Sequence, residues 1–173
     1  MSRLVALGVS VAVVAGCGYR PVASVALPSA GRLYIAPPRA TRVDEPRFAI
    51  AYVTALSRAL ARRGLALAPT ASAAWRLDTR VLALRSGDPS VAQRRVARRD
   101  LAIELSVRLW CARDAGASAW RSPLLRARQP WALAADAAES ERSRRQSVLR
   151  LAERAAQQVA QLLAEHLRRQ QQR

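Results

Sequence analysis

The sequence of 173 residues contains no lysine, one histidine and only two cysteines. Two cysteines cannot supply the disulfide framework of a small secreted domain, so burial of apolar side chains must hold the fold. His166 has no cluster of cysteines or carboxylates near it, which excludes the usual spacing of a metal site. The seven glycines are scattered and form no phosphate-binding loop. We therefore predict no catalytic residue, metal or cofactor, and an enzyme is the weakest functional class.

A long apolar run occurs only near the N-terminus. There a basic head, Met1 to Arg3, precedes an uncharged stretch over residues 4–15 and small residues up to Cys17. This layout is typical of a secretory signal peptide. The stretch is too short for a transmembrane anchor, which needs roughly 20 apolar residues. We predict that residues 1–16 are a signal peptide.

The end of this stretch, Val14-Ala15-Gly16-Cys17, resembles a bacterial lipobox. The resemblance implies that the thiol of Cys17 receives a diacylglycerol, that the chain is cut before it, and that the new amine is acylated. Several acyl chains make a stable anchor. Residues 17–30 would then be a lipidated tether, and Gly18 implies outer-membrane sorting because Asp there is the usual inner-membrane signal. The alternative is an ordinary signal peptide followed by a disulfide between Cys17 and Cys111.

Every one of the 29 basic residues is an arginine. Removing residues 1–16 leaves 157 residues, enough for one domain, with 28 arginines against 12 acidic residues and a net charge of +16. The guanidinium fork suits carboxylates and phosphates, so anionic lipid or a phosphorylated glycolipid is a plausible partner. Nucleic acid is not expected, because a periplasm-facing lipoprotein meets little of it. Nucleotide bias of the genome is the competing explanation for the arginine content.

The pattern of apolar residues predicts a mixed α+β fold. Two segments repeat apolar residues every three or four positions and are predicted helices: residues 46–63, with Gly64 just past the end, and residues 139–168. Four segments alternate apolar and polar side chains and are predicted strands: residues 31–36, 75–83, 100–109 and, with two prolines, 119–131.

The order of these elements is β-α-β-β-β-α. One apolar face on an about four-stranded sheet and one apolar stripe on each helix form a core if both helices pack on the same face, as in a two-layer sandwich. Residues 31–168 would form this domain, and residues 169–173 a disordered tail. The other face of the sheet would be polar and arginine-rich, free for solvent or a partner.

Two groups of side chains could contact a partner. Four arginines near the predicted hairpin could bind the phosphates of lipopolysaccharide or another anion through charge-assisted hydrogen bonds, although a solvated loop is the simpler interpretation: Arg94, Arg95, Arg98 and Arg99. Four tryptophans could contact a membrane protein or lipid, although packing within the domain is the simpler interpretation: Trp75, Trp110, Trp120 and Trp131.

Several segments together resemble the lipopolysaccharide-assembly lipoprotein family LptE. They are CGYRP, GRLYIAPP, LSRALARRG, ALAPTASAAWRLDTRVLAL and LAIELSVRL. The resemblance implies a small sheet with two helices on one side and a non-enzymatic role. It also implies that the chain, anchored to the outer membrane, sits within the LptD barrel, assists its assembly and helps place lipopolysaccharide in the outer leaflet. Thr41-Arg42 only partly matches the Asn-Arg-Thr often found in this family.

Two other functions compete with this one. An auxiliary lipid-binding lipoprotein of an ABC-type envelope lipid transporter would share the lipobox, the strand and helix layout and the long last helix. Gly18-Tyr19 and the lack of a tyrosine-rich segment after Cys17 favour the assembly lipoprotein. A cell-envelope hydrolase would need a serine or carboxylate whose removal abolishes turnover.

Overall fold

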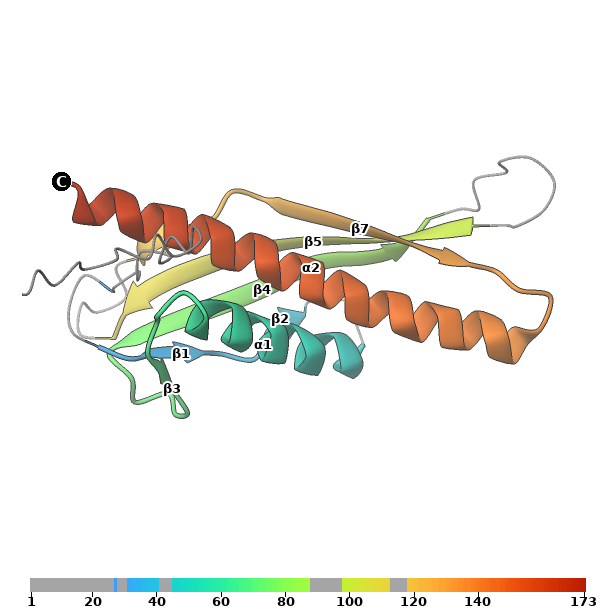
Figure 1. Ribbon diagram of the computed structural model, residues 1–173, viewed down its shortest axis with the longest axis horizontal. Helices are drawn as coiled ribbons and strands as arrows, with labels where there is room; N and C mark the ends of the chain where they lie inside the picture. Colours follow the sequence, from blue (N-terminus) through green and yellow to red (C-terminus); the bar gives the residue numbers. More distant parts are fainter. Residues whose placement is uncertain (1–26, 28–30, 41–44, 88–97, 113–117) are drawn as a thin grey trace, which may run out of the picture.

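The computed structural model describes residue 27 and residues 31–40, 45–87, 98–112 and 118–173. Within them the chain forms an α+β fold of two helices and an open sheet (Figure 1). The helices are α1 (Pro46–Ala61) and α2 (Ala137–Gln171). The strands are β1 (Leu33–Ile35), β2 (Arg39–Ala40), β3 (Leu67–Ala68), β4 (Trp75–Ser86), β5 (Arg98–Cys111), β6 (Ser118–Arg121) and β7 (Leu125–Ala132).

Two long antiparallel strands, β4 and β5, form the centre of the sheet. On one side β1 and β2 pair in turn with β4, both parallel to it, and β3 pairs with β1. On the other side β6 and β7 both pair with β5, at different points along its length. The sheet therefore consists of two continuous inner strands flanked by shorter pieces.

The sheet has seven strands, so the prediction of about four was wrong in number. Prolines explain most of the difference, because proline has no N–H for a strand ladder. Pro37-Pro38 separates β1 from β2, and Pro123 separates β6 from β7. At the second break Val107 N–H donates to Ser122 Oγ over 2.9 Å. β3 has only two residues, too few to show an alternation of apolar and polar side chains in the sequence.

The core lies between the helices and one face of the sheet. α1 packs against α2, and in Figure 1 both helices run in front of the strands. The hydroxyl of Tyr52 on α1 lies 3.0 Å from Thr79 Oγ1 on β4, and both side chains are almost completely buried. Alternate residues of β5, from Leu101 to Leu109, face this core. α2 extends to Gln171, and the backbone of Gly64, with φ of 83°, ends the turn after α1.

A β-bulge interrupts the alternation of β4. Val81 lies opposite Leu105, but Ala83 lies opposite Glu104, so Leu82 is the extra residue. A bulge moves the following side chains to the other face of the sheet. Beyond it Leu84 rather than Ala83 packs against the core. The regular alternation predicted for residues 75–83 therefore holds only as far as Val81.

α2 also covers the free edge of β7. Its Ser143 Oγ accepts a hydrogen bond from Ala132 N–H over 3.3 Å. Two further side chains of α2 donate to backbone carbonyls of the same edge: Ser147 Oγ to Pro130 O (3.2 Å) and Arg154 Nη1 to Arg128 O (2.7 Å). Side chains of the helix thus occupy backbone groups that an edge strand would leave free.

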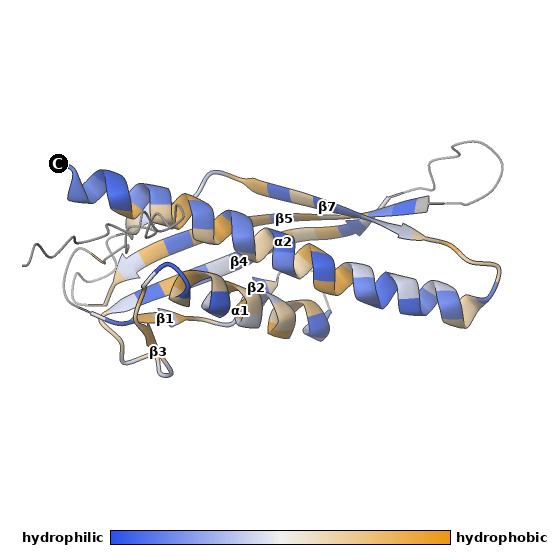
Figure 2. Cartoon of the chain, in the orientation of Figure 1, coloured by the Kyte–Doolittle hydropathy of each residue, from blue (hydrophilic) through white to orange (hydrophobic). Residues whose placement is uncertain are grey.

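The helices of the described residues do not resemble membrane spans. None of them is both long and apolar enough to cross a bilayer. Figure 2 shows hydrophilic and hydrophobic segments alternating along α2. The predicted signal peptide, residues 1–16, and most of the predicted tether, residues 17–30, lie outside the described residues.

Candidate functional surfaces

The face of the sheet that points away from the helices is polar and rich in arginine. Cross-strand register places Asp78 of β4 opposite Arg108 of β5, and Arg80 opposite Ser106. These four residues alternate with the buried ones, so their side chains lie on the outer face. We call this surface the outer face.

One end of the outer face contains a cluster built around Arg76. Its Nε donates to Asp78 Oδ1 over 2.8 Å, and Trp110 Nε1 donates to Asp78 Oδ2 over 2.8 Å. The guanidinium carbon of Arg76 lies 5.8 Å from the ring centroid of Tyr34 and 5.5 Å from that of Trp110. Both carboxylate oxygens of Asp78 are therefore engaged within the cluster.

Beside this cluster the outer face is hollowed by about 850 Å³. Four exposed arginines from four strands line the hollow: Arg39 (β2), Arg80 (β4), Arg108 (β5) and Arg121 (β6). Asp78 is the only carboxylate among the lining residues. Further along the outer face Arg126 Nε lies 3.0 Å from Glu104 Oε1, so the carboxylate of Glu104 forms an ion pair with Arg126.

The arginines predicted to contact lipopolysaccharide do not all belong to one described site. Arg94 and Arg95 lie outside the described residues. Arg98 and Arg99 begin β5, where they lie opposite Ala132 and Trp131. Arg99 occupies a core-facing position and is half-buried. Its Nε and the indole Nε1 of Trp131 are both buried donors without a hydrogen-bond partner among the described residues.

The predicted lipidation residue, Cys17, lies outside the described residues. The other cysteine, Cys111, is a buried free thiol at the end of β5, opposite Trp75. Among the tryptophans, Trp75 and Trp131 are buried, and Trp120 stacks on His166. Packing therefore accounts for three of the four tryptophans, while Trp110 belongs to the outer face.

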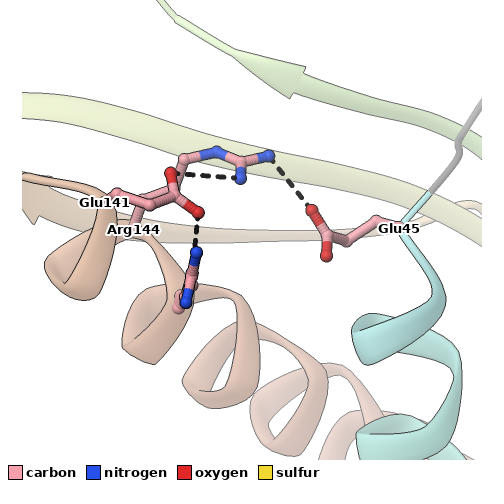
Figure 3. A network of polar contacts seen from close by, with 4 residues as sticks. Glu45, Glu141 and Arg144 are labelled. Atoms are coloured by element: carbon pink, nitrogen blue, oxygen red, sulfur yellow. Dashed lines mark hydrogen bonds and ion pairs between the residues drawn. The ribbon is translucent and has the colours of Figure 1, made fainter. Parts of the chain in front are cut away.

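A network of acidic and basic side chains joins the start of α1 to α2 (Figure 3). Arg144 Nη2 lies 3.0 Å from Glu45 Oε2 and Nη1 lies 3.7 Å from Glu141 Oε2, while Arg145 Nε lies 2.8 Å from Glu141 Oε1. The hydrogen bond from Arg145 is the main reason that the pKa of Glu141 is lowered. These carboxylates pair with arginines at helix starts and do not form a catalytic acid and base.

His166 lies near the end of α2, its ring 5.7 Å from that of Trp120. Partial burial lowers the pKa of His166, and the positive charges of Arg169 and Arg173 lower it further. In the part of the chain that the structure describes, no three His, Cys, Asp or Glu side chains gather closely enough to hold a metal ion.

The fold and these surfaces can be compared with known proteins. The lipopolysaccharide-assembly family model LptE matches residues 30–163. The chain belongs to the LptE family. The match spans every strand and most of α2, and the resemblance noted in the sequence is confirmed. LptE is a non-enzymatic family of lipopolysaccharide-assembly lipoproteins. No curated protein matches the chain.

Solved structures share the fold at low sequence identity. A Xanthomonas campestris protein is 15% identical with a TM-score of 0.59, over 87% of this chain and 95% of its own. Lipoprotein B of Nitrosomonas europaea is 15% identical with a TM-score of 0.53, over 85% and 90% of the two chains. A minor lipoprotein of Acinetobacter baumannii is 13% identical with a TM-score of 0.53, over 78% and 90%.

Proposed function

We propose that this LptE-family chain is an outer-membrane lipoprotein, anchored through Cys17, that binds the LptD barrel. There it would assist assembly of the barrel and insertion of lipopolysaccharide into the outer leaflet. The family match over residues 30–163 is the observation that carries this proposal. The lipobox at residues 14–17 supports the anchor, and the arginine-rich outer face supports a role in binding.

The proposed anchor would keep the domain close to the membrane. Leu27 lies ten residues after Cys17 and packs against the core, so the tether between the anchor and the domain is no longer than ten residues. Ten extended residues reach at most about 35 Å. A domain on so short a tether faces the periplasm at the membrane surface or lies inside the barrel.

Direct contact with lipopolysaccharide is a separate part of the proposal. Arg94, Arg95, Arg98 and Arg99 are the residues proposed to bind its phosphates. The guanidinium groups of these residues support this assignment, because they can form charge-assisted, bidentate hydrogen bonds to phosphate.

Replacing all four of these arginines with glutamine should weaken binding of lipopolysaccharide micelles, more strongly at low salt than at high salt. A control variant, Arg142→Gln with Arg150→Gln, changes exposed arginines on α2. Equal binding by the parent protein and the four-site variant would exclude the phosphate contact.

The binding proposal is tested by purifying the tagged, lipidated protein in detergent and identifying what remains bound by mass spectrometry. We expect a stoichiometric outer-membrane barrel, and we expect that barrel to fail to mature when the chain is depleted. Normal maturation of the barrel would contradict the proposal. Recovery of an inner-membrane ABC transporter would instead assign the chain to the alternative function.

A further inference from the structure

The hollow on the outer face brings like charges together in pairs. Strand register places Arg39 of β2 directly opposite Arg80 of β4, and Arg108 of β5 directly opposite Arg121 of β6. Like charges at directly opposite positions of neighbouring strands destabilise a sheet. A fold that retains two such pairs beside one another is suited to an anionic partner lying between them.

The described residues do not neutralise these four arginines. None of them forms an ion pair with a described residue, whereas Arg76 and Arg126 on the same face do. Asp78 is the only carboxylate among the described residues that line the hollow, and both its oxygens already accept hydrogen bonds from Arg76 and Trp110. The positive charge of the hollow is therefore available to a molecule outside the chain.

The spread of the arginines indicates an extended ligand with several negative groups. They come from four neighbouring strands, and strands lie about 4.8 Å apart, so the row is about 14 Å wide. A single phosphate binds where donors converge on one point, but these side chains rise from a broad sheet surface. Carboxylates spaced along a polypeptide would meet such a row, each accepting a bidentate pair of hydrogen bonds.

Aromatic side chains beside the hollow also favour a protein partner. Tyr34 and Trp110 lie on either side of the Arg76 guanidinium at the edge of the charged surface. Tyrosine, tryptophan and arginine are the residue types enriched at protein interfaces and at their energetic centres. The cluster would be an interface anchor that is already ordered before binding.

We propose that the outer face is a docking surface for an acidic polypeptide segment of the protein partner, whose carboxylates pair with Arg39, Arg80, Arg108 and Arg121. A second copy of this chain does not suit the surface, because its net charge of +16 after removal of residues 1–16 would repel rather than attract. The inference rests on the proposed function in taking the barrel as that partner. It adds the surface of this chain and the chemistry of the segment that binds it.

The test compares two variants of the full, lipidated chain that lose equal charge. Arg80→Gln with Arg108→Gln removes one arginine from each like-charged pair. Arg142→Gln with Arg150→Gln is the matched control on the helical side, where both arginines are exposed. Each protein is used to recover the barrel from detergent extracts at low and high salt, and each is assayed for lipopolysaccharide binding and thermal unfolding.

We expect the outer-face variant to bind the barrel at least about tenfold more weakly than the parent at low salt, with a smaller dependence on salt. The control should bind like the parent. Removing one charge of each pair should leave the unfolding temperature unchanged or raise it. If it falls instead, Arg39→Gln, at the edge of the sheet, replaces the double variant and should also weaken recovery of the barrel.

The possible results separate this inference from the proposed function. Equal recovery of the barrel by the parent and the outer-face variant would refute the docking surface and leave the function intact. Loss of lipopolysaccharide binding with full barrel recovery would assign the hollow to phosphates and also refute it. Failure of the parent to recover any barrel would overturn the proposed function and this inference with it.

Discussion

The hydrogen bond between Tyr52 and Thr79 allows a stringent test of how α1 is held on the sheet. Both side chains are at most 1% exposed, and their oxygens lie 3.0 Å apart. Thr79→Val conserves volume but leaves the tyrosine hydroxyl buried without this partner, which costs about 1–3 kcal/mol. Tyr52→Phe should cost less, about 0.5–1.5 kcal/mol, because a threonine hydroxyl can rotate toward another acceptor.

The double variant should be less destabilised than the sum of the two single variants. It removes both polar groups together, and replacing both partners of a buried hydrogen bond by apolar groups is nearly neutral. The coupling free energy in the double-mutant cycle should then approach the sum of the two single losses, at least about 1.5 kcal/mol. With a urea dependence of about 2 kcal/mol per molar, a loss of 1 kcal/mol shifts the unfolding midpoint by roughly 0.5 M.

The free energy of unfolding of the parent, the two single variants and the double variant is measured in urea by circular dichroism. Thr54→Val, at an exposed position of α1, is the control for replacing threonine with valine. If the loss of stability in the double variant equals the sum of the two single losses within about 0.5 kcal/mol, the two side chains do not interact, and their hydrogen bond does not hold α1 on the sheet.

The dependence of stability on pH gives a second test of the same contact. Burial raises the pKa of the Tyr52 hydroxyl, whereas an unfolded tyrosine ionises near about pH 10. Stability should fall as pH rises past this value, and Tyr52→Phe should remove part of that fall.

Three further substitutions test local features. Asp136→Ala should cost about 0.5–2 kcal/mol in urea unfolding, because its carboxylate caps α2 by accepting hydrogen bonds from two backbone N–H groups; an unchanged midpoint would exclude the cap. Gly64→Ala should cost about 1 kcal/mol because φ there is 83°, and no loss would mean the turn is not strained by a side chain. His166→Gln should reduce the loss of stability between about pH 7 and pH 5. The pKa of His166 is lowered in the folded state, so acid favours the unfolded chain, and identical pH profiles would contradict this sign.

Long periodic segments were predictable, and short or interrupted ones were not. The apolar stripes of α1 and α2 and the alternation of β5 each extend over many residues, so their spacing identifies them. The bulge in β4 was hidden because Val81 to Leu84 is apolar at every position, and alternation cannot show there which residue is extra. β3, with two residues, offers no pattern at all.

The outer face was predictable as polar and arginine-rich, but its hollow was not. Alternation along β4 and β5 places Arg80 and Arg108 opposite the core-facing residues, and this much follows from the sequence. That Arg39 lies beside Arg80 and Arg121 beside Arg108 depends on strand pairing and register. Pairing between segments far apart in the chain is determined by tertiary contacts that one sequence does not display.

The covered edge of β7 has a consequence for any partner that is itself built of strands. A β-barrel could in principle extend this sheet by adding a strand to one of its edges. On one side three side chains of α2 already occupy backbone groups of β7, and on the other Pro37-Pro38 limits the edge pieces to a few residues. Within the described residues, neither edge offers a long row of free backbone donors and acceptors. A strand-built partner such as the barrel proposed above would therefore recognise this domain by the side chains on its faces rather than by adding a strand to its sheet.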